Sequence, residues 1–479
     1  MREVDIAIVG AGPAGLAAAA EAAAAGASAA LIDMNARLGG QYWRHAPADD
    51  EPGAPAPRWH HGWGTYASLA KAVRAGEANG RIHHLAETHV WAIDRVAGGF
   101  ELQVARTAEA CASGGHQQLS GVRARRLILA TGAYDRQLPV PGWDLPGVMA
   151  AGGIQAFIKV QGVAPGRRVV LAGTGPFLLA AANSVLQAGG EVAAIVESST
   201  LTRWFPRGAL GALVPSKGAE GAQYAAALVK NRVPYLTRHA VTEVIGSGSV
   251  TGVRVAKLNA QGAPQPGTER TFSGVDLVGF GWGFTPQTEL ITQLGAQSRL
   301  DMDGSLVGVV DQHLESTVPG LFLAGELTGV KGAAGAVADG RIAGRAAAKA
   351  APRRRDLAAR ARHAAFAQAM HRAHPVPDGW SEWLTDHTTI CRCEEVRYAE
   401  VRSAITELHS HDPRRMKGST RVGMGFCQGR ICGYAAQCLT NQVHGNDAAA
   451  AVTSAEHVSK RPLALPIELG KLADHELPD

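Results

Sequence analysis

Short apolar runs alternate with glycine-rich turns along the first part of the chain. The first run, at residues 5–9, leads into a glycine-rich sequence at residues 10–15, and an alanine-rich stretch continues to about Ala25. A second apolar run at residues 28–32 ends at Asp33. A buried strand, a tight turn, a helix and a second buried strand account for this pattern. We therefore predict that the chain begins with a strand-turn-helix-strand unit.

The spacing of the glycines gives this unit a chemical role. Gly10 would allow the tight turn, Gly12 the close approach of a pyrophosphate, and Gly15 the close packing of the helix on the sheet. Free N–H groups at the start of the helix would face the phosphates. Asp33 lies 23 positions after Gly10, where an acid accepts hydrogen bonds from ribose hydroxyls. A chance glycine-rich turn is the alternative. The strand before the turn, the helix after it and the downstream acid favour dinucleotide binding.

Two further segments place small residues where a flat cofactor would lie. Paired glycines at residues 39–40 would let the backbone lie against a ring, and Gln41 would hydrogen-bond it, although an ordinary glycine turn is the alternative. The apolar run at residues 126–130 ends in Thr131 and Gly132, which would let a cofactor cross the carboxyl end of a strand. Alternation at residues 87–94 and 100–105 predicts an antiparallel meander.

A similar pattern occurs near residue 325. A buried run at residues 321–324 ends in Gly325 and Glu326, and a helix of small residues begins at residues 332–338. Glu326 would bind the polyhydroxyl chain of a flavin, and the helix N-terminus near Gly335 and Ala336 would stabilise an anionic reduced ring. A plain strand-helix crossover is the alternative. The predicted cofactor-binding residues are Gly10, Gly12, Pro13, Ala14, Gly15, Asp33, Met34, Gly40, Gln41, Val90, Ala130, Thr131, Gly132, Gly325, Glu326, Gly335 and Ala336.

A second dinucleotide-type unit follows the first. A strand at residues 167–172 leads into Gly173 and Gly175, and a strand at residues 191–196 ends at Glu197. Glu197 lies 24 positions after Gly173, close to the spacing in the first unit. Leu178 replaces the third glycine, so the helix and strand cannot approach as closely. A nicotinamide nucleotide site and a degenerate structural copy both remain open here.

Composition restricts the classes of function. The 479 residues, 46% of them hydrophobic, can form two or three globular domains. The formal net charge is only +5, and no basic patch interleaved with aromatic residues is present, so nucleic-acid binding is disfavoured. Glu21 and the glycine-rich turn interrupt the apolar segment at residues 6–32, so we expect neither a signal peptide nor a membrane span there. We expect a cytoplasmic protein.

The cysteines gather near the C-terminus. Cys111 stands alone, and no cysteine precedes it, which argues against the redox cysteine pair of a disulfide reductase. The other five lie in the last quarter, which suggests a metal site rather than a disulfide framework. Cys438 is expected to be a packed thiol, and the remaining four form a CxC and CxxxxC pattern separated by 33 residues: Cys391, Cys393, Cys427 and Cys432. Zinc and a 2Fe-2S cluster are the two candidates, and this spacing is a poor match to zinc ribbons.

The motifs together resemble two known groups of protein domains. GAGPAG with Asp33, LILATGAYDR at residues 127–136 and LFLAGE at residues 321–326 are similar to flavoproteins with two dinucleotide-binding domains and the glutathione-reductase-like fold. CRCEEV at residues 391–396 and KGSTRVGMGFCQGRIC at residues 417–432 resemble the small helical ferredoxin module related to bacterioferritin-associated ferredoxin. The resemblance implies an α/β fold with two Rossmann-like domains, bound FAD, and a 2Fe-2S cluster on the four cysteines. Leu178 departs from the family pattern and puts nicotinamide nucleotide binding in doubt.

These resemblances imply a domain order. We expect the first part of the FAD domain at residues 1–150, an inserted NAD(P)-type domain at 151–272 and the second part of the FAD domain at 273–350. A helical linker at 351–385, a 2Fe-2S module at 386–445 and a tail at 446–479 would follow.

The whole set of motifs is similar to the FAD and iron-sulfur subunits of heteromeric amino-acid oxidising enzymes, a group that includes opine oxidases, proline-type dehydrogenases and hydrogen cyanide synthase. In that group a separate flavoprotein subunit oxidises the amine. We therefore expect this chain to receive electrons from such a partner and to pass them through FAD and the cluster to an acceptor. A self-sufficient NAD(P)H-dependent reductase is the second hypothesis, and an iron-sulfur storage or delivery module is the third. No residue is predicted to act as an amine-oxidising base.

Overall fold

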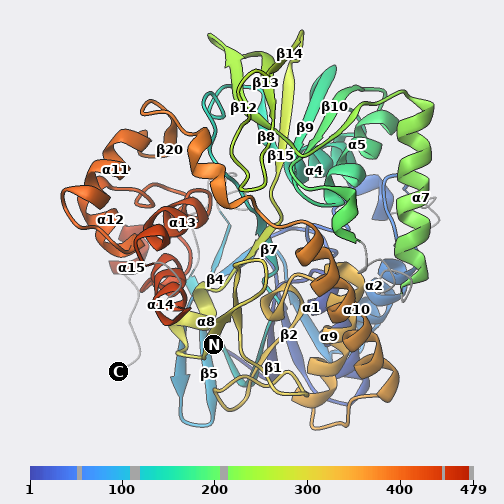
Figure 1. Cartoon of the computed structure of the whole chain (residues 1–479). Coiled ribbons are helices and arrows are strands. Elements are labelled where there is room, and N and C mark those ends of the chain that lie inside the picture. The colour runs from blue at the N-terminus through green and yellow to red at the C-terminus, as the bar shows by residue number, and fades with distance from the viewer. Residues whose placement is uncertain (51–56, 108–118, 205–213, 445–447, 474–479) are drawn as a thin grey trace.

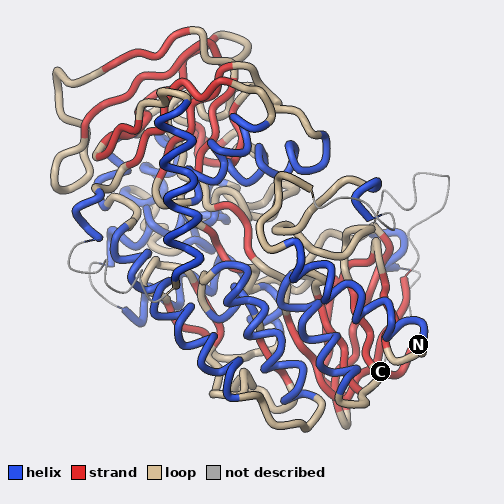
Figure 2. The backbone as a smooth tube through the Cα atoms, turned by 90° about the vertical axis from the view of Figure 1, so that its right-hand side faces the viewer, coloured by secondary structure: helices blue, strands red, loops and turns tan. Residues whose placement is uncertain are grey.

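The computed structural model describes residues 1–50, 57–107, 119–204, 214–444 and 448–473. Two sheets, the first mixed and the second parallel, are each flanked by helices and form the body of the molecule, and the C-terminal helices pack beside them (Figure 1). Figure 2 shows the same arrangement from the side, with the small antiparallel sheet at the top. Within the described residues, no helix is long and apolar enough to cross a bilayer.

The first sheet contains the predicted N-terminal unit. Its strands run in the order β3-β2-β1-β6-β5-β4, and β19 also pairs with β6. The bounds are β1 (Arg2–Val9), β2 (Ala29–Ile32), β3 (Ile82–Leu85), β4 (Thr88–Val96), β5 (Gly99–Arg106), β6 (Leu119–Leu129) and β19 (Leu321–Leu323). β6 is long enough to pair with β5 along its first half and with β19 along its second. The predicted strands and the meander at residues 87–105 are confirmed.

Two helices of small residues pack closely on this sheet. They are α1 (Pro13–Ala24) and α9 (Gly332–Ala347), and α2 (Trp63–Ala78) lies beside α1. A Cβ at Gly340 or Gly344 would collide with the carbonyl oxygen of Ala14 or Ala18, respectively. Only small side chains allow this approach, which explains why both helices are rich in alanine and glycine.

The second sheet is parallel throughout, with the order β11-β10-β9-β15-β8. Its strands are β8 (Val148–Ala150), β9 (Arg168–Gly173), β10 (Glu191–Glu197), β11 (Tyr235–Thr237) and β15 (Leu277–Gly281). The helices α4 (Ala151–Gln161), α5 (Phe177–Gln187) and α7 (Pro215–Lys230) accompany it, and the antiparallel strands β12 (His239–Gly246), β13 (Val250–Lys257) and β14 (Arg270–Ser273) follow. The second predicted strand-helix-strand unit is confirmed.

Short elements connect the two sheets. β7 (Ala133–Asp135) pairs antiparallel with β16 (Phe284–Pro286), which is followed by α8 (Glu289–Gln293). A hairpin of β17 (Ser298–Leu300) and β18 (Leu306–Gly308) then leads back to β19. The chain therefore leaves the first sheet after β6 and returns to it at β19.

The C-terminal part is mainly helical. α10 (Arg354–Ala373) packs on α9 and buries Asp356, His363 and Ala369, so one face of this charged helix is covered. The hairpin β20 (Thr389–Cys391) and β21 (Val396–Arg397) precedes α11 (Tyr398–Thr406), α12 (Pro413–Thr420), α13 (Gly433–His444), α14 (Ala448–Ser459) and α15 (Leu469–Ala473). Helices therefore make up most of the segment for which the sequence resemblance implies a small helical module.

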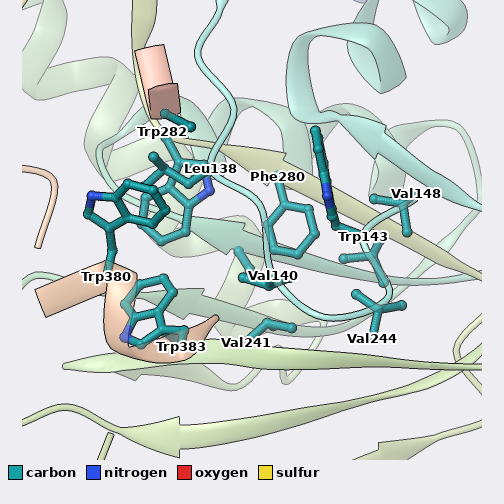
Figure 3. Packing of buried hydrophobic residues seen from close by; sticks show 14 of the residues in the cluster. Leu138, Val140, Trp143, Val148, Val241, Val244, Phe280, Trp282, Trp380 and Trp383 are labelled. Atoms are coloured by element: carbon teal, nitrogen blue, oxygen red, sulfur yellow. The ribbon is translucent and has the colours of Figure 1, made fainter. Parts of the chain in front are cut away.

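One hydrophobic core joins the C-terminal part to the second sheet. Trp380 and Trp383, which follow α10, pack with Trp282 and Phe280 from β15 and the turn after it (Figure 3). The ring centroids of Trp282 and Trp383 lie 5.5 Å apart. Val401, Met416 and Leu439 from the C-terminal helices belong to the same buried cluster. The segment before the helices is thus anchored in the protein interior.

Candidate functional site

The glycine turn after β1 has the geometry that its sequence predicts. Gly10 has a φ of +102°, and a Cβ there would collide with the carbonyl oxygen of Ala130. A Cβ at Gly15 would collide with the carbonyl oxygen of Gly10. Around Gly12, in contrast, the nearest atom to a built Cβ is the Cα of Gly40 at 3.9 Å. The two outer glycines are needed for packing, and Gly12 has room for a Cβ.

Asp33 is fixed beside this turn. It follows β2, is buried, and its carboxylate accepts a hydrogen bond from the backbone N–H of Ala11 at 2.5 Å. Its other oxygen accepts bonds from the backbone N–H and the Nδ2 of Asn35. Met34 between them is 53% exposed. The predicted ribose-binding acid and the predicted phosphate turn are therefore adjacent.

Two more predicted segments end at the same edge of the sheet. The backbone N–H of Ala130 donates to Val9, and that of Ala324 donates to Leu129, so the ends of β1, β6 and β19 lie side by side. A Cβ built on Gly325 would lie 3.1 Å from the Cβ of Ala14 and 3.5 Å from that of Ala336. The fold thus gathers Gly10, Gly12, Pro13, Ala14, Gly15, Ala130, Thr131, Gly132, Gly325, Gly335 and Ala336 at or near one end of the first sheet.

Other predicted contacts have different surroundings. Glu326 accepts hydrogen bonds from the backbone N–H groups of Lys331 and Gly332, just before and at the start of α9. Burial raises the pKa of this carboxyl to about 7. Val90 lies in β4 and is packed in an apolar core, and Gln41 is exposed on the loop before Trp43.

A buried charge network supports the Gly325 loop. Asp339 on α9 is fully buried and accepts hydrogen bonds from the backbone N–H of Gly325 and the hydroxyl of Thr328. Its carboxylate also pairs with Lys331 at 2.8 Å and Arg360 at 3.3 Å. Our sequence reasoning missed Asp339, although a single acid within a helix of small residues was the available signal.

The second dinucleotide-type unit is assembled, but its acid is already hydrogen-bonded. Glu197 is buried and accepts bonds from the hydroxyl of Thr174 and the backbone N–H groups of Gly175 and Ser199. The Nδ1 atom of His374, just after α10, lies 3.5 Å from the same carboxylate. All three predicted residues, Gly173, Gly175 and Glu197, therefore lie together, with a side chain from the C-terminal part packed beside them.

Leu178 has a clear packing role in this unit. It is fully buried on α5, and a Cβ built on Gly281 of β15 would lie 3.1 Å from its Cδ2 atom. The leucine thus fills the space between helix and sheet that a third glycine would leave.

The four predicted cysteine ligands line one cavity of about 250 Å³. Cys391 comes from β20, Cys393 follows it, and Cys427 and Cys432 come from the loop before α13. Hydrogen bonds link the thiols in two pairs, Cys391 with Cys432 and Cys393 with Cys427. Across the cavity lie Gln137, Trp143 and the strand β8.

These thiols fit an iron-sulfur cluster in type and number. Four cysteines from two short segments share one cavity, and the backbone at Gly425 lies so close to Cys393 that a Cβ there would collide with it. Within the described ranges, no set of three or more His, Cys, Asp or Glu side chains is already arranged around a metal position. The thiols also interact electrostatically across the two pairs, Cys393 with Cys391 and Cys432 with Cys427.

Cys438 is separate from this set. Burial raises the pKa of its thiol to about 11, and it hydrogen-bonds Tyr434 on α13. It packs in the interior, as the sequence predicted. Cys111 lies outside the described residues.

Comparison with known proteins establishes the family. The family model described as "Pyridine nucleotide-disulphide oxidoreductase" matches residues 4–340. The chain belongs to this family. As a pyridine nucleotide-disulphide oxidoreductase, it has a mixed α/β, Rossmann-like fold of the FAD-binding oxidoreductases and is a flavin oxidoreductase.

Individual relatives of this oxidoreductase match nearly its whole length. Hydrogen cyanide synthase subunit HcnB of Pseudomonas aeruginosa is 31% identical over 465 residues, which cover 92% of this chain and 93% of the relative. An opine oxidase subunit of Rhizobium meliloti is 29% identical, with 98% of each chain covered. L-proline dehydrogenase from P. horikoshii has a similar fold, with a TM-score of 0.66, 21% sequence identity and coverage of 98% of this chain and 79% of that one. The first two are named as subunits of larger enzymes.

Proposed function

We propose that this chain is the FAD- and 2Fe-2S-containing electron-transfer subunit of a heteromeric flavin-dependent dehydrogenase or oxidase acting on an amino acid, such as a secondary amine, opine or imino acid. A separate flavoprotein subunit would oxidise the substrate. The observation that carries the proposal is the single cavity lined by four cysteines in a chain that also has the FAD-type glycine turn. Matches to subunits of hydrogen cyanide synthase and opine oxidase over almost the whole chain support it.

The chain would have two cofactor sites, and the first would bind FAD. Gly10, Gly12 and the start of α1 would hold the FAD pyrophosphate, and Asp33 would bind its ribose. The start of α9, fixed through Glu326 and Asp339, would lie against the flavin. Bound FAD would exchange two electrons with the donor.

At the second site, Cys391, Cys393, Cys427 and Cys432 would hold the cluster, which carries one electron at a time. The burial of Cys391 and Cys432 would limit access of water to that side. A chain with both sites would convert a two-electron donor into a source of single electrons for an acceptor. The proposal also includes the domain limits that we expect from the sequence and a cytoplasmic location.

The deciding experiment is anaerobic co-purification of the chain with its partner from the native source. We expect a flavin absorbance spectrum, an EPR signal of a reduced binuclear cluster, and iron in the ratio of one such cluster per FAD of this chain. Cys427→Ala should remove the EPR signal, and Cys438→Ala is the matched control that should retain it. Iron-free wild-type protein, or rapid amine oxidation by this chain alone, would contradict the proposal.

A self-sufficient NAD(P)H-dependent reductase is the second candidate, because Gly173, Gly175 and Glu197 lie together in the second unit. Glu197, however, is buried and already bonded to three donors of its own chain. Anaerobic titration with NADH and NADPH separates the two functions. Prompt bleaching of the flavin supports the reductase, and an unchanged flavin spectrum supports the electron-transfer role.

A further inference from the structure

A buried arginine connects the cysteine loop to the first sheet. Arg430 lies between Cys427 and Cys432, and its side chain is 12% exposed. Its Nε atom donates to the hydroxyl of Tyr134 at 2.6 Å and lies 3.0 Å from the carboxylate of Glu289, at the start of α8. Its Nη2 atom donates to the carbonyl oxygen of Ala464. One guanidinium thus holds together the cysteine loop, the connection between the sheets and the C-terminal segment.

A second arginine lies at the same carboxylate. Arg461 is 8% exposed, and its Nη1 atom lies 3.8 Å from Glu289. Its Nη2 atom donates to the carbonyl oxygen of Val458 and would lie 3.9 Å from a Cβ built on Gly429 of the cysteine loop. Two buried cations, one in the cysteine loop and one next to it, therefore share one buried anion. The local group carries a net positive charge.

The position of Tyr134 relates this group to the predicted flavin site. Tyr134 lies on β7, two residues after Gly132 and three after Thr131. From the same segment, Arg136 lies over the ring of Tyr434 on α13, with its Cζ atom 4.1 Å from the ring centroid. Each side of the interface thus places an arginine against a tyrosine of the other. These two pairs fix the cysteine loop on the segment that leaves the predicted flavin site.

We propose that the buried positive charge of Arg430 raises the reduction potential of the cluster, and that Glu289 limits this rise. The inference rests on the proposed function, since it needs a cluster on the four cysteines. When the cluster accepts one electron, one ferric ion becomes ferrous, no bond forms or breaks, and the site gains one negative charge. A buried positive charge stabilises that extra charge more strongly than a solvated one, because water screens it less. The higher potential favours electron transfer from the reduced flavin to the cluster.

The test is an EPR-monitored redox titration of the anaerobically purified holoprotein and three variants. Arg430→Gln and Arg461→Gln should each lower the midpoint potential of the cluster, and Glu289→Gln should raise it. We expect Arg430→Gln to change the ratio of reduced to oxidised cluster at a fixed potential at least tenfold, which is about 59 mV for a one-electron couple. Loosening of the interface alone would not give shifts of opposite sign for the two partners of one ion pair.

Arg421→Gln is the matched control. This arginine precedes the same loop and also pairs with an acid, Glu394, but its side chain is 68% exposed, so its removal should change the potential much less. If the Arg430 variant lacks iron, the Glu289 and Arg461 variants decide the sign. In cluster-containing protein, a shift for Glu289→Gln in the same direction as for the arginine variants overturns this inference and leaves the proposed function intact. A shift for Arg421→Gln equal to that for Arg430→Gln does the same. Wild-type protein without a cluster overturns both.

Discussion

Among single residues, Gly12 offers the sharpest test of the predicted FAD site. Its φ is −75°, and a built Cβ meets only the Cα of Gly40 at 3.9 Å, so alanine can be accommodated without strain. The added methyl group would occupy the space predicted for the pyrophosphate. We expect Gly12→Ala to weaken FAD binding at least tenfold, about 1.4 kcal/mol, with little change in the stability of the flavin-free protein. The FAD content after dialysis and thermal unfolding measure the two effects.

If Gly12→Ala lowers both the thermal stability of the flavin-free protein and the FAD content, the substitution disturbs the fold instead. Gly10→Ala gives the comparison, because its positive φ and the nearby Ala130 carbonyl predict loss of both.

Lys159 makes the stability of the protein depend on pH. Its ammonium on α4 is buried and donates to the carbonyl oxygen of Tyr42, and burial lowers its pKa from 10.5 to about 8. Between these two values the unfolded chain binds more protons than the folded one, so this residue's contribution to stability rises with pH. We expect wild type to gain stability relative to Lys159→Met between about pH 7.5 and pH 9.5. Thermal unfolding at both pH values measures the difference.

The exposed Lys230 at the end of α7 is the control for this measurement. Lys230→Met should follow wild type at both pH values. The same pH dependence in both variants would assign the effect to other groups.

At the scale of elements, the contact between α1 and α9 depends on glycine. A Cβ at Gly344 would collide with the carbonyl oxygen of Ala18, so Gly344→Ala should destabilise the protein by about 1–3 kcal/mol through overpacking. Gly221 on α7 has no atom within 4 Å of a built Cβ, and Gly221→Ala should instead stabilise by about 0.5–1 kcal/mol. Chemical denaturation of both variants checks this opposition of sign. Stabilisation by both substitutions would show that the helices can separate without loss.

Most elements were predictable because local pattern and tertiary role agree. β1, α1 and β2 combine apolar strands with a turn that only glycine can form, and α5 and β10 repeat this arrangement. The face of α10 that packs on α9 was not predictable, since its charged side chains also suit a solvated helix. Its buried contacts depend on where α9 lies, which no local signal contains.

The candidate sites show the same limit. The clustering of the cysteines predicted a metal site, and the family resemblance implied its four ligands; Cys391 and Cys432, 41 positions apart, do line one cavity. The sequence did not indicate that His374 would lie beside Glu197, or that Arg430 would reach Tyr134, because these contacts join segments 170 or more residues apart. Only the packing of the C-terminal part on both sheets brings them together.

At the scale of the whole molecule, the shared core predicts that the second sheet and the C-terminal helices unfold together. Trp383 is 4% exposed, packs on Trp282 and donates from its Nε1 atom to the carbonyl oxygen of Gly262. Trp383→Ala should lower the free energy of unfolding by about 3–5 kcal/mol, because it leaves a large cavity in this core. Tryptophan fluorescence, flavin release and loss of the cluster absorbance should then shift to lower temperature together. Phe157→Ala on α4, where the side chain is 39% exposed, should change each signal little. A cluster signal that shifts alone would mean that the cysteine-bearing C-terminal part unfolds as an independent unit, with Trp383 contributing only to the stability of that part.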